Sequence, residues 1–178
     1  ASVLDEGGMI PYVEEAATPK EELIHLLKFA PEVEHALMVQ YLYTAYTIPD
    51  HLNVLRQTLL LVARQEMGHF LSVQNILLSL SGIEDVHLHK SIYRHSSPDN
   101  PLPFSLEPAG KHVIAKFLSV EAPPFQNIPP ERREEVIKIH NSVKATGIMI
   151  NPVGGLFKKM ESLIENELSL EGCAVTIF

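Results

Sequence analysis

The chain has 178 residues, of which 46% are apolar and 20% are charged, the composition of one ordinary globular domain. Acidic residues outnumber basic ones by 22 to 14, and the formal net charge of −8 argues against nucleic acid or a membrane as partner. A single cysteine excludes an intrachain disulfide framework, and the lack of a signal peptide or an apolar run of about 20 residues leads us to expect a cytoplasmic protein.

The first predicted helix follows an arm, residues 1–17, that shows no periodicity. Thr18 is placed to cap this helix, Pro19 suits its first position, and Glu21 completes a Thr-x-x-Glu capping box. Beyond the cap, apolar positions recur every three or four residues, as on one face of a helix. This first stripe comprises Leu23, Leu27, Ala30, Glu34, Leu37, Tyr41 and Thr44. Pro31 lies within the same helix and predicts a kink or a short break.

The second predicted helix begins near Asn53 and ends at Gly82, a residue suited to the left-handed capping conformation. Its stripe comprises Leu55, Leu59, Val62, Glu66, His69, Val73, Ile76 and Leu80. The short link before it makes the first two helices antiparallel neighbours. Residues 82–108 contain four prolines and no helical period, which predicts a long connection across the end of a bundle.

Two further helices are predicted in the second half of the chain. The third covers about residues 108–121, and the fourth begins at Pro130 and continues to residue 150. Their inner positions are Ile114, Phe117 and Glu121 on the third helix, and Val136, His140, Val143, Gly147 and Ile150 on the fourth. This order of elements predicts an all-α four-helix bundle with one long crossover connection between its second and third helices.

The pattern divides the chain into three parts. The arm covers residues 1–17, the bundle covers 18–150, and a short helix at 156–168 followed by an apolar tail makes up residues 151–178. Two interpretations of the tail remain open: it packs on the bundle, or the native chain continues past it.

Ionisable side chains occupy inner positions where the helical pattern calls for apolar residues. The five come from four predicted helices and are Glu34, Glu66, His69, Glu121 and His140. A carboxylate in a bundle core is costly unless it is paired or bound to a metal. One divalent cation site explains the whole set, because carboxylate oxygen and imidazole nitrogen are common metal ligands. The alternative is a polar cluster without a metal, in which Glu121 faces water and His140 is a hydrogen-bonded core histidine.

The sharpest local motif is Glu66-x-x-His69, because residues three apart on a helix project from the same face. Di-iron and di-manganese carboxylate bundles combine one glutamate from each of two helices with Glu-x-x-His from each of the other two. The fourth helix departs from that rule, since Ile137 stands three residues before His140. A depleted or absent second metal position, and therefore a single-metal site, remains open.

Two stretches of the chain resemble a known family. Residues 33–43 (VEHALMVQYLY) and 64–70 (RQEMGHF) are similar to the ferritin-like domain of the imino-phenylpyruvate dimer synthase type. The resemblance covers roughly residues 20–145 and is most specific in the first two helices. Domains of this type occur in enzymes that build bisindole natural products. The resemblance implies a ferritin-like bundle, a carboxylate–histidine metal site and an oxidative role.

Four candidate ligands match the motif positions of that family. Glu34, Glu66 and His69 match directly, and Glu121 matches the third-helix glutamate that is followed closely by a proline. The family resemblance favours iron, whereas the ligand types alone also permit manganese or zinc.

The leading hypothesis is a non-haem metalloprotein that activates dioxygen to oxidise or couple a small organic substrate. In this hypothesis Glu66 bridges two metals, Glu34 and His69 hold one, and Glu121 with His140 holds the other. The rival hypothesis is a non-catalytic metal-binding or scaffold bundle that serves a partner enzyme, and iron storage is a third. The sequence assigns no catalytic residue and no substrate, and it leaves open a homo-oligomer or a partner enzyme.

Overall fold

The computed structural model describes residues 16–86 and 101–168, and every regular element in these two ranges is helical. In chain order the elements are α2 (Pro19–Tyr46), η1 (Asp50–Leu52), α3 (Asn53–Ser81), η2 (Ile83–Asp85), α4 (Lys111–Val120), η4 (Phe125–Asn127), α5 (Pro130–Lys144), α6 (Gly154–Ser162) and the π-helical η5 (Leu163–Leu168). The prediction of an all-α chain is confirmed. Nearly all of the predicted arm, most of the crossover and the apolar tail lie outside the described residues. None of the described helices combines the length and the apolar character needed to cross a membrane.

Helix α2 begins at the predicted capping box. The Glu21 N–H donates to the Thr18 hydroxyl at 3.2 Å, and the Glu21 carboxylate accepts the Ala17 N–H at 2.9 Å. Of the kink or short break predicted at Pro31, the break does not occur, since α2 continues to Tyr46. A proline removes one backbone donor, and the buried residues on both sides of Pro31 keep the helix in place.

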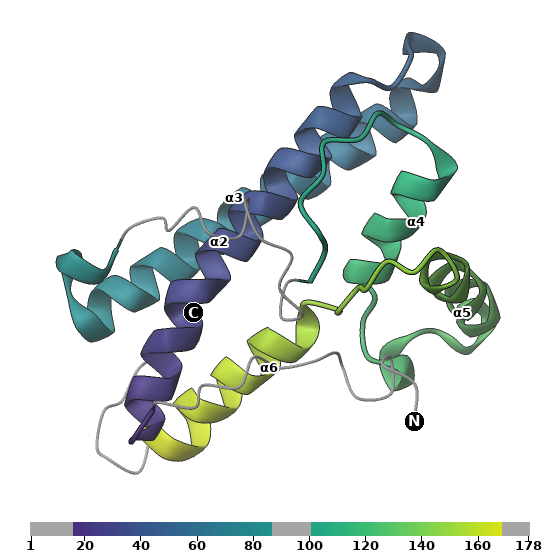
Figure 1. Ribbon diagram of the computed structural model, residues 1–178. Helices are drawn as coiled ribbons and strands as arrows, with labels where there is room; N and C mark the ends of the chain where they lie inside the picture. The colour runs from purple at the N-terminus through teal and green to yellow at the C-terminus, as the bar shows by residue number, and fades with distance from the viewer. Residues whose placement is uncertain (1–15, 87–100, 169–178) are drawn as a thin grey trace.

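The long helices α2 and α3 form an antiparallel pair that crosses the whole molecule (Figure 1). Helix α3 ends where predicted, at Gly82, whose φ of +91° favours glycine and whose N–H donates to the Leu78 carbonyl at 3.1 Å. Helix α6 runs beside the first part of α2. Helices α4 and α5 pack against each other nearer the opposite end of the pair, where α2 connects to α3 (Figure 1). The α2–α3 pair is therefore covered by different helices at its two ends.

Two apolar clusters correspond to these two coverings. One joins α2 and α3 to α4 through buried side chains such as Leu37, Tyr41 and Phe117. The other joins α2 and α3 to α6 through side chains such as Leu27 and Met160. On α3, Glu66 and His69 lie between the residues of the two clusters, and on α2 Glu34 lies at the edge of the first cluster, so apolar packing on either side holds them in position.

Side chains of α2 also hold the end of the crossover. Residues 101–110 run along the α2–α3 pair before α4 begins (Figure 1). The Ser105 N–H donates to the Gln40 side-chain oxygen at 3.1 Å, and the Thr44 hydroxyl donates to the Glu107 carbonyl at 2.8 Å. Because residues four apart lie on one helix face, these polar side chains supply the irregular segment with partners for its backbone.

The fourth predicted helix is shorter than expected. It was predicted to reach residue 150, whereas α5 ends at Lys144. The chain turns at Gly147, where φ is +79°, and the Asn151 N–H then donates to the Pro101 carbonyl at 2.9 Å. This contact, which joins distant parts of the chain, replaces the last two helical turns of the prediction. In Figure 1, α5 is seen almost end-on beside α4.

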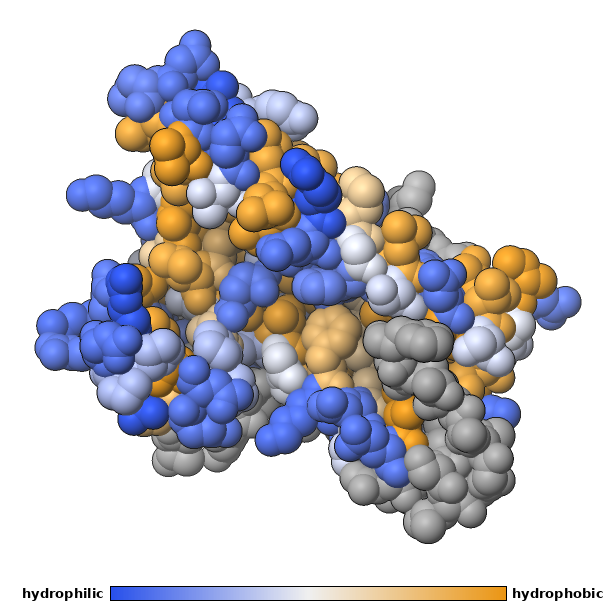
Figure 2. Space-filling view, turned by 180° about the vertical axis from the view of Figure 1, so that it is seen from behind, coloured by the Kyte–Doolittle hydropathy of each residue, from blue (hydrophilic) through white to orange (hydrophobic). Residues whose placement is uncertain are grey.

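Apolar side chains also reach the surface, in patches separated by polar ones (Figure 2). Helix α3 contributes several of them, including Leu61, Met67, Leu71 and Leu78, each at least 40% exposed. Scattered exposure of this kind is ordinary in folded proteins. An exposed leucine of α3 therefore serves as a control for the substitution of a buried leucine in the same helix.

Replacing Leu77 by alanine tests the packing of α3 against α2 and α6. Leu77 is 1% exposed, so its truncation leaves a cavity and lowers the free energy of unfolding by about 3 kcal/mol. The neighbouring Leu78 is 42% exposed, and Leu78→Ala is expected to cost less than about 1 kcal/mol. Urea denaturation of both variants measures the difference, and equal losses would contradict this packing.

Candidate metal centre

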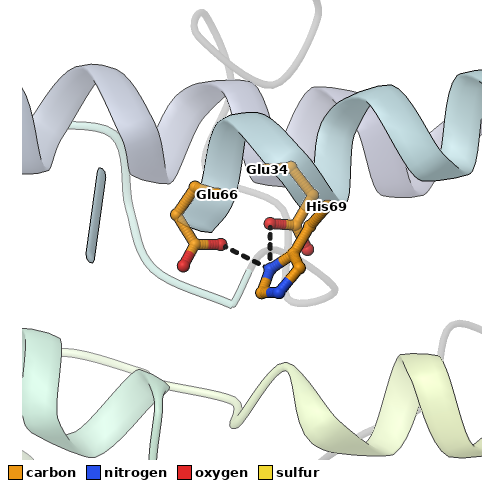
Figure 3. A group of neighbouring side chains, drawn as sticks. All are labelled: Glu34, Glu66 and His69. Carbon is orange, nitrogen blue, oxygen red and sulfur yellow. Dashed lines mark hydrogen bonds and ion pairs between the residues drawn. The ribbon is translucent and has the colours of Figure 1, made fainter. Parts of the chain in front are cut away.

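Two buried glutamates face each other across the α2–α3 pair, and a histidine stands beside them (Figure 3). Glu34 on α2 and Glu66 on α3 are 1% and 3% exposed. His69 lies one turn after Glu66, and its Nδ1 is 3.2 Å from Glu66 Oε2 and 3.6 Å from Glu34 Oε2. One ligand atom from each residue lies within 4.8 Å of the others. These three residues, called the Glu–Glu–His group below, form the one such cluster found among the described residues.

The position of His69 differs from the expectation of a dry, inward-facing imidazole. Its side chain is 56% exposed, whereas both glutamates are buried. The Glu–Glu–His group therefore lies at the edge of the α2–α3 interface, with the carboxylates inside and the imidazole at the boundary. This leaves one side of the group open to a small molecule.

The donor set fits a divalent cation. Two ligands held about 2.1 Å from one ion lie about 3–4 Å apart, which matches the distances from His69 Nδ1 to the two carboxylates. Glu34 Oε2 is a buried oxygen that forms no hydrogen bond with the described residues, and its ion-pair contact with His69 Nδ1, at 3.6 Å, is too long to be one. A buried carboxylate oxygen in this state is costly, and a cation would satisfy it. Glu34, Glu66 and His69 are therefore the residues that could hold a metal.

Without a cation, the group is neutralised by protons. Burial, and then the nearby Glu34 carboxylate, raise the pKa of Glu66 from 4.5 to about 8. Attraction to Glu34 and then to Glu66 raises the pKa of His69 from 6.5 to about 9, although partial burial opposes this shift. Near neutral pH the group thus holds protons on both Glu66 and His69. A divalent cation would displace them, because metal ligands must be deprotonated.

Tyr41 connects this region with Glu121. Its phenol is fully buried and donates a hydrogen bond to the Glu121 carboxylate. Burial and the charge of Glu121 raise the pKa of Tyr41 well above 10, so the phenol keeps its proton. Glu121 is the residue directly after α4 and is exposed as a whole, but loss of water around its carboxyl group and the charge of Glu66 raise its pKa to about 7. Glu121 is therefore electrostatically coupled to the Glu–Glu–His group without belonging to it.

The structure places His140 elsewhere. It lies on α5 and lines a separate hollow of about 290 Å³, together with Val143 and Gly147 among others. Its Nδ1 is buried and forms no hydrogen bond with the described residues. Burial, and then the charge of Lys144, lower the pKa of His140, which keeps the imidazole neutral. This placement gives no support to the prediction that His140 shares a metal with the other candidates.

Comparison with known proteins agrees with this arrangement of helices and side chains. A family model described as ferritin-like matches residues 27–174, which covers most of the chain and includes all the candidate ligands. The chain belongs to the ferritin-like family. The fold and the family suggested by the motifs in α2 and α3 are therefore confirmed. No solved structure matches the chain significantly.

Two curated relatives are similar to this ferritin-like chain. One is the dichlorochromopyrrolate synthase of Lentzea aerocolonigenes, 30% identical over 58% of this chain and 13% of the relative. The other is the 2-imino-3-(indol-3-yl)propanoate dimerase of Chromobacterium violaceum, 28% identical over 62% of this chain and 14% of the relative. Both are named as enzymes, which agrees with the expectation of an enzyme. The matched part makes up about one seventh of each relative's length.

A cavity adjoins the exposed side of the candidate metal centre in this ferritin-like chain. It has a volume of about 880 Å³ and lies between α3, α6 and residues 124–127, with His69 in its wall. We call it the α3–α6 cavity. The ring of Phe157 on α6 lies beside the His69 ring, with 6.3 Å between their centroids. The sequence does not predict that Phe157 lies beside His69, because the apolar pattern of α6 does not reveal which helix it packs against.

The protonation of the Glu–Glu–His group predicts how the stability of the metal-free protein depends on pH. Glu66, Glu121 and His69 all have pKa values in the folded state above their usual values. Between about pH 5 and pH 9 the folded state therefore binds more protons than the unfolded state, so stability falls as pH rises. We expect the melting temperature in the presence of a chelator to drop by at least about 5 °C from pH 5.5 to pH 8.5.

The Glu66→Gln variant provides the control for this pH dependence. Its amide does not titrate, so about half of the drop should disappear while the fold is retained, because His69 and Glu121 still titrate. A melting temperature of the metal-free wild type that rises across the same pH range would contradict the assigned proton positions.

Proposed function

We propose that this chain is the metal-binding part of a non-haem oxidoreductase that uses iron and dioxygen to oxidise or couple a small organic substrate. The observation that carries the proposal is the Glu–Glu–His group, with two buried carboxylates at the edge of a helix interface. Two buried carboxylates within 4.8 Å of each other have a large electrostatic cost that a divalent cation would remove. The site would thus be formed by helices α2 and α3 together.

Glu34, Glu66 and His69 would hold the ion. Iron is favoured by the family, and manganese or zinc would suit the same oxygen and nitrogen donors. Iron bound there would supply the electron-transfer chemistry with dioxygen that amino-acid side chains lack.

The observations favour one ion in this group. A second ion, with Glu66 as a bridge, would require Glu121 and His140 as further ligands. Glu121 is engaged by the Tyr41 phenol, and His140 lines a different hollow. One ion with three protein ligands would also leave coordination positions open, as catalytic metal sites require.

Tyr41 and Glu121 would serve the site by holding a proton near it. The Glu121 carboxyl, with a pKa of about 7, can bind or release a proton near neutral pH, while its partner Tyr41 stays protonated. The hydrogen bond from Tyr41 fixes that carboxyl in place, where the charge of Glu66 contributes to its raised pKa. A group with such a pKa suits acid–base steps at neutral pH.

The relatives suggest the kind of substrate. One relative is named for an imino acid that carries an indolyl group, and the other for the synthesis of dichlorochromopyrrolate. By analogy we infer a small aromatic substrate in natural-product biosynthesis. The chain matches about one seventh of each relative's length. The proposal therefore includes a partner enzyme, a further domain or a second copy of the chain that acts together with the metal centre.

Metal analysis tests the proposed site. Wild-type protein incubated with ferrous iron under anaerobic conditions should retain about one equivalent after desalting, and Glu66→Gln should retain less than about a tenth of that. The matched control is Glu32→Gln, since Glu32 is also buried on α2 but lies outside the group. Equal, near-zero iron in the wild type and in both variants would refute the metal centre.

Exposure to oxygen distinguishes the enzyme from the scaffold. If the site is an oxidoreductase centre, the iron-loaded wild type should consume dioxygen and oxidise its ferrous iron faster than free iron at the same concentration. Iron that stays bound and ferrous in air would favour the non-catalytic metal-binding bundle.

A further inference from the structure

The α3–α6 cavity is large enough and open enough to receive an organic molecule. Its volume of about 880 Å³ falls within the range of small-molecule sites in proteins. His69 forms part of its wall, and the Glu34 and Glu66 carboxylates lie 3.6 Å and 3.2 Å from the Nδ1 of that imidazole. A molecule in this cavity would lie next to the candidate metal centre without entering the buried α2–α3 interface.

The lining of the cavity has two distinct parts. Its apolar surface combines side chains of α2, α3 and α6, including Leu27, Val73, Ile76 and Met160. Its polar part includes the side-chain amides of Gln126 and Asn127 and the Ser72 hydroxyl, which donates to the Gly68 carbonyl and so offers the ligand only an acceptor. An apolar floor with a few hydrogen-bonding groups is typical of a site for a small organic ligand. The methionine sulfur and the Phe157 ring make favourable contacts with aromatic rings in particular.

The charges of the lining are nearly balanced. Lys158 contributes one positive charge, Glu161 and Glu165 contribute two negative ones, and an ion held at His69 would add further positive charge. A neutral hydrogen-bonding group such as an amide, imine or hydroxyl therefore suits this lining, because it needs no charged partner.

We propose that the α3–α6 cavity binds a planar aromatic molecule, with its ring on the apolar floor and a neutral hydrogen-bonding group toward Ser72, Gln126 and Asn127. The proposal rests on the proposed function, since it identifies where the substrate of that metal centre sits. It adds that α6, through Phe157 and Met160, determines which ring fits.

A second apolar cavity provides the comparison. It has a volume of about 540 Å³, lies between the start of α3 and α4, and includes Leu55 and Ile114 in its lining. None of the candidate metal ligands lines it. A ligand bound there would lie away from the Glu–Glu–His group. A substitution in the lining of this second cavity should therefore leave binding of a probe to the α3–α6 cavity unchanged.

Fluorescence titration with indole-3-acetamide tests the proposal. The chain contains no tryptophan, so the indole emission of this neutral probe can be excited selectively. We expect saturable binding to metal-free wild type, weakened at least about tenfold by Ile76→Phe, which places a bulkier side chain on the apolar floor where the ring of the probe would lie. Leu55→Phe, on the same helix but in the other cavity, should bind like wild type. Ser72→Phe blocks the cavity from an exposed position and replaces Ile76→Phe if that variant fails to fold.

Two further measurements decide the remaining parts of the proposal. Cyclohexylacetamide should compete at least about tenfold less well than the indole probe, and equal competition would overturn the aromatic preference. NMR signals of the probe should broaden with manganese-loaded protein and stay sharp with zinc-loaded protein. Manganese is paramagnetic and broadens the signals only of nuclei close to it, whereas zinc is diamagnetic.

The outcomes separate this proposal from the proposed function. No binding by wild type, equal binding by wild type and both cavity-filling variants, or loss of binding in Leu55→Phe alone would overturn the cavity assignment, whatever the metal content. Normal probe binding in a protein that retains no metal would support the cavity assignment and refute the metal centre. Saturable binding without broadening by bound manganese would place the probe elsewhere and overturn the inference.

Discussion

The repulsion between two buried carboxylates, Glu34 and Glu66, is the constraint on which the rest of the site depends. Each comes from a long helix whose apolar packing on both sides fixes its position, so neither can move to solvent without separating α2 from α3. The protein must supply positive charge or protons between them. The raised pKa of Glu66 and the nearby His69 show how protons meet this need in the absence of a cation.

Helix α2 organises the molecule around this constraint. One part of it contributes Glu34, and a later part holds the end of the crossover through Gln40 and Thr44. Tyr41, between those two residues, reaches Glu121 at the end of α4. A single helix thus positions side chains from three parts of the chain, because its turns repeat the same face every three or four residues.

Much of the fold was predictable from local patterns. The capping box at Thr18, the end of α3 at Gly82 and the inward position of Glu34 and Glu66 all follow from interactions within one helix or from its periodicity. The end of α5 did not follow. Apolar spacing continues to residue 150, whereas the helix stops at Lys144, the chain turns at Gly147, and the Asn151 N–H bonds to the Pro101 carbonyl of the crossover.

The sequence alone therefore determined which helices form, their family and the pairing of Glu34 with Glu66 and His69, since these depend on periodicity and motif spacing. Tertiary structure decided how the site opens. It placed the His69 imidazole at the edge of the interface, set α6 and Phe157 against it, and carried His140 into another hollow. Those results depend on how helices distant in sequence pack against one another, and a helical period carries no information about the identity of its partner.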